Sequence, residues 1–301
     1  MNPRWRKVPW IRRILFASGL LVLLVVAVLG WRTARFLLRP SPSPKTLQLA
    51  EGVLYSRKVE TDPVPNVIHV VEVDLAISGM RFVVTPRDES SRWDTLARTT
   101  SEWVEETGVL VGVNGSPFEP FHAKHALDYY PKSGDPVDVQ GFSASGGNVY
   151  SEGHPDLPVL YWVGDRPGLG FSVPGDVEWA LSGKQILMTE GRIDIVPVKS
   201  TDDELHPRTM VAYSKSGTNW WLVVVDGRQD DYSEGMSVGQ LAELAESLGA
   251  WNAIGLDGGG SSTMAARVNG KVKVLNAPFH TRIPVRERPV ANHLGLLLGS
   301  D

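Results

Sequence analysis

One stretch constrains the fold most: an apolar run that ends in an aspartate, three glycines and two serines. The run 251–256 ("WNAIGL") is short and uncharged, as expected of a buried strand. Asp257 follows it, and then come Gly258–Gly260, Ser261 and Ser262. Successive glycines let a backbone approach an anion closely, and serine hydroxyls add donors. The stretch predicts either an anion-binding loop at a strand end or a turn carboxylate that caps its own glycine loop.

Two other apolar runs end in the same way, with a polar residue before a glycine. Asn114 ends the run 109–113, and Asp226 ends the run 219–225. Ligand sites in sheets lie outside such strand ends, where loops converge. Asn-Gly and Asp-Gly are also ordinary turn dipeptides. The pattern predicts that Asn114, Asp226 and Asp257 share one rim of a sheet.

Further periodic segments predict an α+β fold, a mixed β-sheet with packed helices in one domain. Asp94 is the expected N-cap of one helix. In another, Ser237 and Gln240 match a capping box, and Gly249 ends the helix. No repeat and no second linker divides this part of the chain. The additional elements are strands over 66–76 and 80–86 and helices over 94–107 and 237–249.

The N-terminal part reads as a separate unit. Residues 14–31 carry no charge, and about 18 residues are near the lower limit for crossing a bilayer core of about 30 Å. Basic residues flank this run and are denser before it, which predicts an N-terminus that stays in the cytoplasm. A buried core helix is the alternative. The predicted parts are a cytoplasmic basic tail (1–13), a transmembrane signal anchor (14–31), a Pro/Ser linker (32–50) and an exported domain (51–301). This organisation predicts a single-pass protein of the inner (cytoplasmic) membrane, with its domain periplasmic or extracellular.

Charge and composition exclude several classes. The formal net charge of −4 argues against a nucleic-acid-binding protein. The absence of cysteine excludes disulfides, cysteine nucleophiles and cysteine metal sites. Ca²⁺ is a possible ligand, because Asp226, Asp230, Asp231 and Glu234 are hard oxygen donors. Their spacing does not fit an EF-hand, so a solvated acidic loop is favoured, and no cofactor or metal ligand is assigned. The oligomeric state is left open.

The segment "RTMVAYSKSGTNWWLVVVDGRQ…EGMSVGQLAELAESLGAWNAIGLDGGGSSTM" resembles the phosphodiester glycosidase family. "GVNGSPF" upstream and "RERPVANHLGLLL" downstream match the same family, so the resemblance covers residues 66–299. Ser116 and Pro117 depart from the family's usual turn, and residues 119–206 match no part of it. The resemblance implies cleavage of a sugar–phosphate diester at the anomeric C–O bond. Residues 119–206 are then expected to set substrate choice.

The resemblance also implies roles for individual residues. Asp257 is the expected primary catalytic carboxylate, as nucleophile or as the base that activates water, with Asp226 as its partner. Arg208 and Arg288 present planar forks that suit phosphate oxygens, whereas Arg228 is a weaker candidate. The expected substrate- and phosphate-binding residues are Asn114, Arg208, Gly258, Gly259, Gly260, Ser261, Ser262, Arg288 and Asn292.

The leading hypothesis is a membrane-anchored hydrolase that acts on a sugar–phosphate diester in envelope or extracellular glycans, including exopolysaccharide. Its partners are the glycan substrate and, through residues 14–31, the membrane. One alternative is a non-catalytic envelope protein that binds glycan or polyanion on the same scaffold, because a fold does not imply an activity. The other is a metal-assisted phosphodiesterase that cuts the P–O bond.

Overall fold

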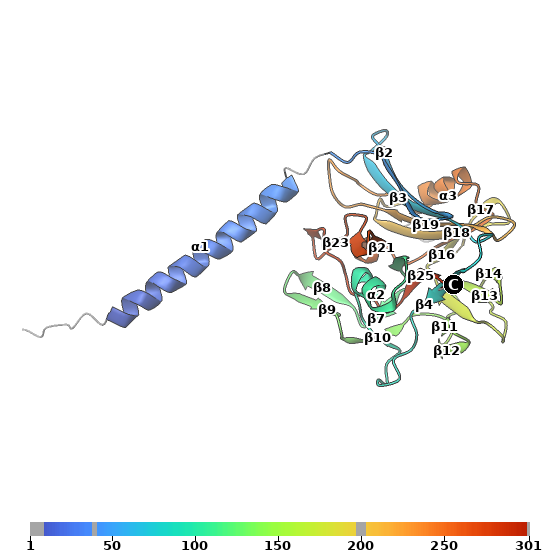
Figure 1. Ribbon diagram of the computed structural model, residues 1–301, viewed down its shortest axis with the longest axis horizontal. Helices are drawn as coiled ribbons and strands as arrows, with labels where there is room; N and C mark the ends of the chain where they lie inside the picture. Colours follow the sequence, from blue (N-terminus) through green and yellow to red (C-terminus); the bar gives the residue numbers. More distant parts are fainter. Residues whose placement is uncertain (1–8, 38–40, 197–202, 300–301) are drawn as a thin grey trace, which may run out of the picture. The chain divides into compact units, whose positions relative to one another are not determined.

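The computed structural model describes residues 9–37, 41–196 and 203–299 and divides into two units, residues 1–41 and 42–301. The first unit contains one helix, α1 (Pro9–Leu37), which includes the run 14–31 (Figure 1). Within the described ranges, no helix is both long and apolar enough to cross a membrane. Most of the predicted basic tail lies outside the described residues.

The second unit is built on an eight-stranded sheet in the order β1-β2-β3-β19-β18-β20-β16-β17. Its strands are β1 (Lys45–Ala50), β2 (Val53–Glu60), β3 (Asn66–Asp74), β16 (Gln185–Thr189), β17 (Arg192–Val196), β18 (Arg208–Tyr213), β19 (Asn219–Val225) and β20 (Asn252–Gly255). All its neighbouring strands are antiparallel. The start of this unit thus supplies an edge strand, and residues 45–50, predicted to be linker, belong to the sheet.

Both faces of the central strands are covered, which explains their continuous apolar sequences. In β19, Trp221, Val223 and Val225 pack on the face covered by α3 (Val238–Ser247). Trp220, Leu222 and Val224 pack on the opposite face. Every residue of β19 after Asn219 is therefore buried. Its side chains alternate between the two faces of the sheet, but the sequence shows no alternation of apolar and polar residues, because both faces are apolar.

Two five-stranded sheets complete the architecture. One has the order β22-β21-β6-β25-β4 and the other β12-β11-β15-β13-β14. The strands of the first are β4 (Met80–Val84), β6 (Val111–Asn114), β21 (Met264–Val268), β22 (Lys271–Val274) and β25 (His293–Leu298). The strands of the second are β11 (Ser143–Ser145), β12 (Asn148–Ser151), β13 (Val159–Val163), β14 (Arg166–Gly170) and β15 (Trp179–Ser182).

Short elements surround these sheets. A three-stranded sheet comprises β5 (Thr95–Leu96), β7 (Phe118–Glu119) and β10 (Pro136–Val139). Two hairpins pair β8 (His122–His125) with β9 (Asp128–Tyr130), and β23 (Phe279–His280) with β24 (Ile283–Pro284). The glycine loop forms a 3₁₀ turn, η1 (Gly259–Ser261). Among the described residues, the only parallel pairing is an isolated bridge between Phe279 and Arg286.

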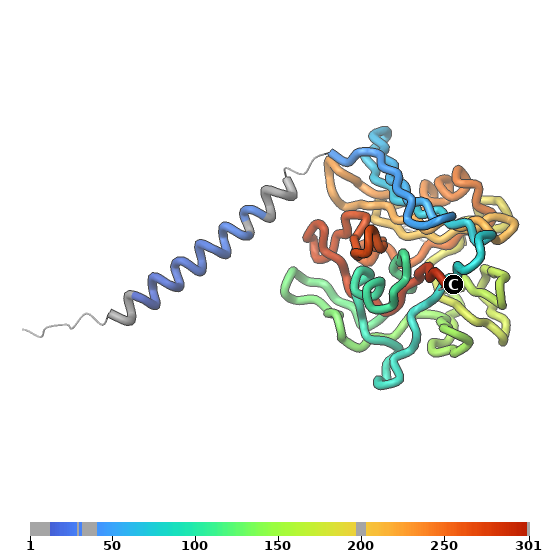
Figure 2. The backbone as a smooth tube through the Cα atoms, in the orientation of Figure 1, coloured from blue at the N-terminus to red at the C-terminus, as the bar shows by residue number. Residues whose placement is uncertain are grey.

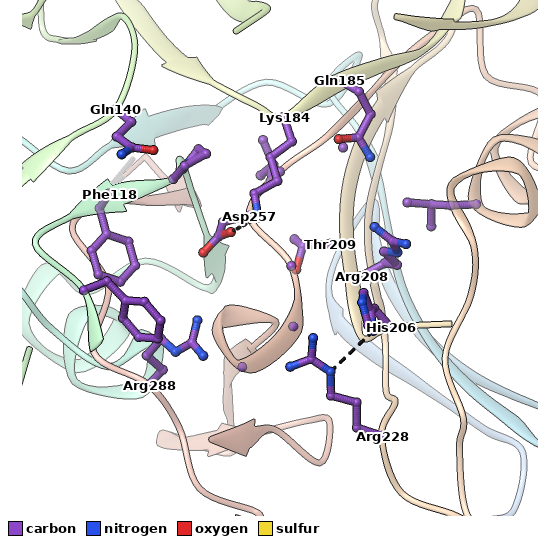
Figure 3. A pocket seen from close by; sticks show the side chains of 18 residues that line it. Phe118, Gln140, Lys184, Gln185, His206, Arg208, Thr209, Arg228, Asp257 and Arg288 are labelled. Carbon is purple, nitrogen blue, oxygen red and sulfur yellow. Dashed lines mark hydrogen bonds and ion pairs between the residues drawn. The ribbon is translucent and has the colours of Figure 1, made fainter. Parts of the chain in front are cut away.

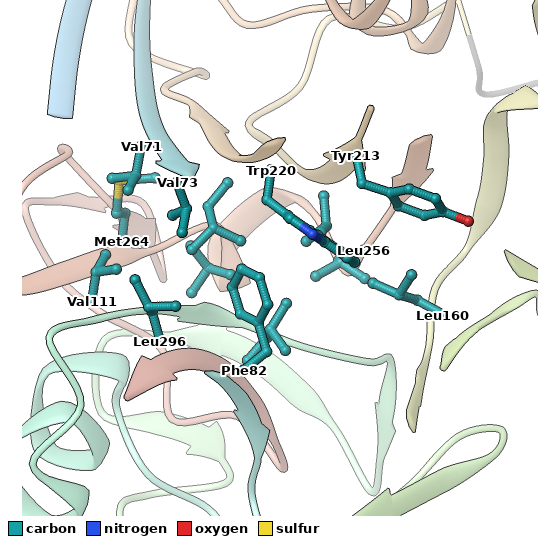
Figure 4. Close-up of a cluster of buried hydrophobic side chains, with 14 of the residues drawn as sticks. Val71, Val73, Phe82, Val111, Leu160, Tyr213, Trp220, Leu256, Met264 and Leu296 are labelled. Atoms are coloured by element: carbon teal, nitrogen blue, oxygen red, sulfur yellow. The ribbon is translucent and has the colours of Figure 1, made fainter. Parts of the chain in front are cut away.

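A buried aromatic cluster joins the three large sheets (Figure 4). Trp220 of β19 is fully buried and lies at its centre. Its ring centroid is 4.9 Å from that of Phe82 in β4, 5.1 Å from that of Trp162 in β13 and 4.8 Å from that of Tyr213 in β18. The main core of the domain is therefore shared by all three sheets.

The predicted elements are largely present, and the chain brings distant segments together (Figure 2). The predicted strand at 66–76 is β3, which pairs along its length with β19. Helix α3 has Ser237 as its N-cap and the predicted capping box with Gln240. The α+β class with packed helices is confirmed.

The prediction that a helix begins at Asp94 is wrong. Helix α2 spans Thr100–Thr107, with Thr99 as its N-cap and a capping box to Glu102. The Asp94 carboxylate instead accepts a hydrogen bond from the Val139 N–H at 3.0 Å. The sequence Thr-Thr-Ser-Glu carries the reciprocal capping signal, which fixes the helix start later than the first acidic residue.

Candidate active site

A cavity of about 380 Å³ opens beside the end of β20, where Asp257 follows the strand (Figure 3). Its lining is rich in cations, which are Lys184, Arg208, Arg228 and Arg288. Asp257 is the only carboxylate among the described residues that line it. The remaining polar and aromatic lining includes Phe118, Phe121, Gln140, Gln185, His206 and Thr209. The glycine loop 258–260 forms part of the wall, so the predicted loop does lie at a cavity.

Two side chains, Lys184 and Ser261, contact the Asp257 carboxylate directly, and a third, Arg288, acts through Ser261. One of its carboxylate oxygens, Oδ1, is 2.6 Å from Lys184 Nζ. The other, Oδ2, accepts a hydrogen bond of 2.5 Å from the Ser261 hydroxyl. Arg288 Nη1 in turn donates to Ser261 Oγ at 3.2 Å. Each carboxylate oxygen is thus oriented by a different partner.

The surrounding charges keep Asp257 ionised. Burial raises the pKa of this carboxyl, but the Lys184 and Arg288 charges and the hydrogen bonds from Lys184 and Ser261 outweigh burial. The net pKa therefore lies below its usual value. Arg288 itself is largely buried, and burial lowers the pKa of its guanidinium to about 10, which leaves it cationic at neutral pH.

The glycines are needed because two guanidinium groups lie against the loop. A side chain on Gly260 would collide with Arg288, and Gly259 adopts a left-handed φ of +63° beside Arg228. Three of the loop amides donate to protein carbonyls, although the sequence predicted amides that face an anion. Gly259 N–H donates to the Pro207 carbonyl, and the Ser261 and Ser262 N–H groups donate to carbonyls of the loop itself. The loop thus supplies space for arginines, and the arginines supply the positive charge.

The three arginines differ in how they are held. Arg208 donates through Nε to the Met236 carbonyl at 2.8 Å and through Nη2 to the Glu204 carbonyl at 2.9 Å. Arg228, the weaker candidate in the sequence, donates through Nε to His206 Nδ1 at 3.4 Å and lies next to Gly259. Burial lowers the pKa of Arg228, while the Glu204 and Asp257 charges oppose the change. All three line the cavity, so the sequence underestimates Arg228.

Asn114 lies behind the site. Its side chain is fully buried, and its Nδ2 donates to the Asp257 carbonyl at 2.7 Å. Its Oδ1 accepts from the Thr209 hydroxyl at 2.7 Å and from the Thr263 N–H at 3.1 Å. Asn114 therefore ties together β6, β18 and the two ends of the glycine loop. Asn114 was predicted to bind substrate, but its contacts instead orient the strand end that carries Asp257.

Asn292 also lies away from the cavity. It is fully buried, and its Oδ1 accepts a 2.7 Å hydrogen bond from the Ser116 N–H. Its Nδ2 donates to the hydroxyls of Ser116 and Ser143, both at 3.2 Å. Because its amide is used to fix the turn after β6, the structure does not bring it to the substrate side.

Asp226 belongs to a separate buried network. Its Oδ1 accepts from the Ala277 N–H at 2.8 Å and from Asn276 Nδ2 at 3.0 Å. Its Oδ2 lies 3.1 Å from His69 Nε2 and accepts from the Tyr232 hydroxyl at 3.4 Å. The residue is buried and does not line the cavity. The structure therefore does not pair Asp226 with Asp257 across a substrate.

Of the two serines, Ser261 is bonded to the cavity residues, whereas Ser262 is bonded to the buried Asp226 network. Ser261 contacts both Asp257 and Arg288, as described above. Ser262 is buried, does not line the cavity, and its hydroxyl has no hydrogen-bond partner in the described part of the chain. Its carbonyl accepts from Asn276 Nδ2 at 3.0 Å, which links the glycine loop to the Asp226 network.

Over the same described residues, no three His, Asp or Glu side chains gather as a metal site. The residues considered for Ca²⁺ are dispersed: Asp226 is buried in its network, whereas Asp230 and Asp231 are exposed.

A family model described as phosphodiester glycosidase matches residues 107–297. The chain belongs to the phosphodiester glycosidase family. The matched region contains Asp257, the glycine loop and all four cavity cations. No curated protein matches the chain.

Solved structures share the fold of this family member. The catalytic domain of zebrafish N-acetylglucosamine-1-phosphodiester alpha-N-acetylglucosaminidase, auto-inhibited by its pro-peptide, is 20% identical, with a TM-score of 0.60 over 87% of this chain and 85% of that one. A hypothetical protein from Synechocystis is 14% identical, with a TM-score of 0.62 over 86% of this chain. This chain covers 64% of the Synechocystis chain. A protein from Burkholderia pseudomallei is 15% identical, with a TM-score of 0.54 over 77% of this chain and 74% of that one.

Several cavity residues have no signal in the sequence. Lys184 and Gln185 precede and begin β16, within the segment 119–206 that lacks a recognisable motif. Gln185 is brought to the site because β16 pairs with β20, with Gln185 opposite Gly255. Phe121 comes from the same segment, whereas Phe118 ends the "GVNGSPF" motif. Only the sheet pairing could have identified Lys184.

Proposed function

We propose that the domain hydrolyses a sugar–phosphate diester at the anomeric C–O bond. One observation carries the proposal: the ionised carboxylate of Asp257 shares a cavity with four cationic side chains. A phosphodiester is an anion, and guanidinium groups bind phosphate oxygens in a planar, bidentate way. Membership of the phosphodiester glycosidase family supports the same reaction class.

In the proposed reaction, Asp257 attacks the anomeric carbon directly. Its lowered pKa makes it a weak base but leaves it ionised, which favours attack by the carboxylate over deprotonation of water. The C–O bond breaks, and its electron pair leaves with the phosphate monoester. Water then cleaves the glycosyl ester, restores Asp257 and releases a sugar of retained configuration.

The arginines compensate for the missing second carboxylate. A phosphate monoester is a good leaving group, so it needs stabilisation of negative charge more than protonation. Arg288 and Arg228 lie on the glycine loop next to Asp257 and are suited to take that charge as it develops. Lys184 neutralises the carboxylate oxygen that faces it in the free enzyme.

The test is a hydrolysis assay with UDP-GlcNAc and a panel of sugar-1-phosphate diesters. We expect release of free sugar and an intact phosphate monoester, with ¹⁸O from labelled water entering the sugar. Asp257→Asn should lower kcat by about 10³-fold or more, whereas Asp230→Asn, which removes an exposed carboxylate, should not.

Other outcomes identify other functions. Entry of ¹⁸O into the phosphate, with loss of turnover in EDTA, would show a metal-assisted phosphodiesterase. Binding of the diesters without release by folded protein would show a non-catalytic glycan-binding protein. Inversion at the anomeric carbon, read by NMR of the first product, would overturn direct attack by Asp257 and leave water activation.

We also propose that residues 14–31 anchor the protein in the cytoplasmic membrane, with the domain on the outer side. The uncharged run and the denser basic cluster before it support this proposal. The full chain should then resist extraction from membranes by alkaline carbonate, and deletion of residues 14–31 should release it. Protease added outside spheroplasts should digest the domain. A carbonate-soluble full-length chain would exclude the anchor.

A further inference from the structure

The β8–β9 hairpin contacts Arg288 directly, through the residue that precedes β8. The Arg288 guanidinium carbon lies 4.3 Å from the centroid of the Phe121 ring. A cation over an aromatic face at this distance is attracted by the ring quadrupole. Phe121 is supported by Phe118, whose ring meets it edge-on with centroids 5.9 Å apart. In Figure 3, the labelled Phe118 and Arg288 lie on the same side of the cavity, across from His206 and Arg228.

The same hairpin also contacts the hydrogen-bond partner of Arg288. Arg288 Nε donates to His280 Nδ1 at 3.2 Å. Tyr129 of β9 packs edge-on against the His280 ring, with centroids 5.0 Å apart. Burial, together with the charges of Arg288 and Arg286, lowers the pKa of His280 to about 3. The imidazole is therefore neutral at physiological pH, and its Nδ1 is free of a proton and can accept.

A third contact fixes the hairpin to the loop that carries Arg288. Arg286 lies over the Tyr129 ring at 4.6 Å and donates through Nη1 to the Ala126 carbonyl at 3.0 Å. The hairpin is otherwise little covered, because all four residues of β8 are exposed and Leu127 at its turn is 85% exposed. The position of the hairpin and the orientation of Arg288 are therefore coupled.

We propose that Phe121 and Tyr129 are positioning residues, which hold the Arg288 guanidinium in the orientation that binds the phosphate of the substrate. The inference rests on the proposed function, because Arg288 is assigned there to the phosphate. Arg288 Nη1 is already directed to Ser261, and Nη2 lies against Gly260. A guanidinium held on one face by Phe121 and fixed at Nε and Nη1 loses little freedom on binding an anion, so affinity and rate both gain.

The test measures binding of inorganic phosphate by calorimetry, separately from turnover. Phe121→Leu keeps an apolar side chain but removes the ring, and we expect Kd to rise about fivefold. Phe121→Trp should restore binding to within about twofold, because it restores an aromatic face. Phe171→Leu is the matched control, since Phe171 is 43% exposed against 44% for Phe121 and does not line the cavity.

A double-mutant cycle distinguishes positioning from direct contact with the ligand. In the Arg288→Ala background, Phe121→Leu should change Kd no further. Tyr129→Leu should weaken phosphate binding, and Tyr129→Phe, which keeps the ring, should not. Equal effects of Phe121→Leu with and without Arg288 would overturn the proposal, as would unchanged binding in Phe121→Leu.

The outcomes also separate this inference from the proposed function. Wild-type protein that binds phosphate and shows the cycle, but releases no sugar from any diester, would support positioning while the hydrolase proposal fails. Wild-type protein that does not bind phosphate would overturn positioning itself, because no phosphate-binding arginine would be left to orient.

Discussion

The two aspartates at strand ends look alike in the sequence but sit in different surroundings. Asp226 accepts hydrogen bonds from Asn276, Ala277 and Tyr232 and pairs with His69, all out of reach of the cavity. Asp257 faces the cavity and pairs with Lys184, whose side chain is 43% exposed. A carboxylate surrounded by internal donors stabilises the fold, whereas one that faces a cavity is available to a substrate.

Removal of Asp226 should therefore affect stability. Asp226→Ala leaves several buried donors without an acceptor, and we expect a loss of about 3–5 kcal/mol in the free energy of unfolding. Chemical denaturation followed by circular dichroism measures the change. Asp257→Asn, which keeps an acceptor for Ser261, should change stability much less. Equal stabilities for Asp226→Ala and wild type would contradict this assignment, and so would a loss of turnover in Asp226→Asn protein that remains fully folded.

The charge of Lys184 should control the acid limb of the pH–rate profile. The pKa of Asp257 is lowered in the folded protein, so the carboxylate stays ionised, and turnover persists, until the pH falls through that lowered value. Lys184→Met removes the largest lowering charge and leaves burial, which raises the pKa. The acid limb of kcat/KM, which reports the free enzyme, should then move to higher pH. Lys271→Met, at an exposed lysine of β22, is the control. An unmoved limb in Lys184→Met would show that Asp257 does not govern it.

At the scale of single residues, the sequence could identify the cavity residues only where a local motif contains them. Asp257, the glycines and Arg288 lie in such patterns and do line the cavity. Lys184 has no local pattern, because it reaches Asp257 through the pairing of β16 with β20. Asn292 has a pattern, but its amide is used to fix the turn at Ser116. A pattern shows that a residue is constrained, without showing whether a ligand or the fold constrains it.

At the scale of elements, helix α2 gives a specific test of where a helix begins. Thr99 Oγ1 accepts from the Glu102 N–H, and Glu102 Oε2 accepts from the Thr99 N–H. Thr99→Ala should lower the free energy of unfolding by about 1 kcal/mol. Thr46→Ala, at an exposed position of the edge strand β1, is the control and should be close to neutral. A neutral Thr99→Ala would contradict the capping role.

Helices and strands could be predicted from the sequence where neighbouring residues alone define them. The capping box before α3 and the continuous apolar run of β19 are properties of neighbouring residues, and both are confirmed. The start of α2 was misplaced because two acceptors compete in one segment, and Asp94 is used by the Val139 N–H. The short strands between residues 118 and 196 have little periodicity of their own, since pairing with other strands defines them.

At the scale of the whole molecule, the arrangement of sheets had no local signal. Strand β3 pairs with β19, which lies about 150 residues later in the chain, and β4 pairs with β25 at the C-terminal end. Such pairings depend on which apolar faces are buried together, and many arrangements satisfy the same pattern. The pairing of distant strands in turn brings Lys184, Arg228 and Arg288 around Asp257.

The shared core predicts that the domain unfolds as one unit. Trp220 packs against aromatic residues of three sheets, so the buried cluster that contains it is shared by all three. Trp220→Ala should lower the free energy of unfolding by about 3–5 kcal/mol, because it leaves a large cavity at that junction. Far-UV and near-UV circular dichroism should still show a single coincident transition at a lower denaturant concentration. Trp93→Ala, at a half-buried loop position, should cost much less. Two separate transitions in Trp220→Ala would show that the sheets fold independently and that the cavity is assembled from parts that can come apart.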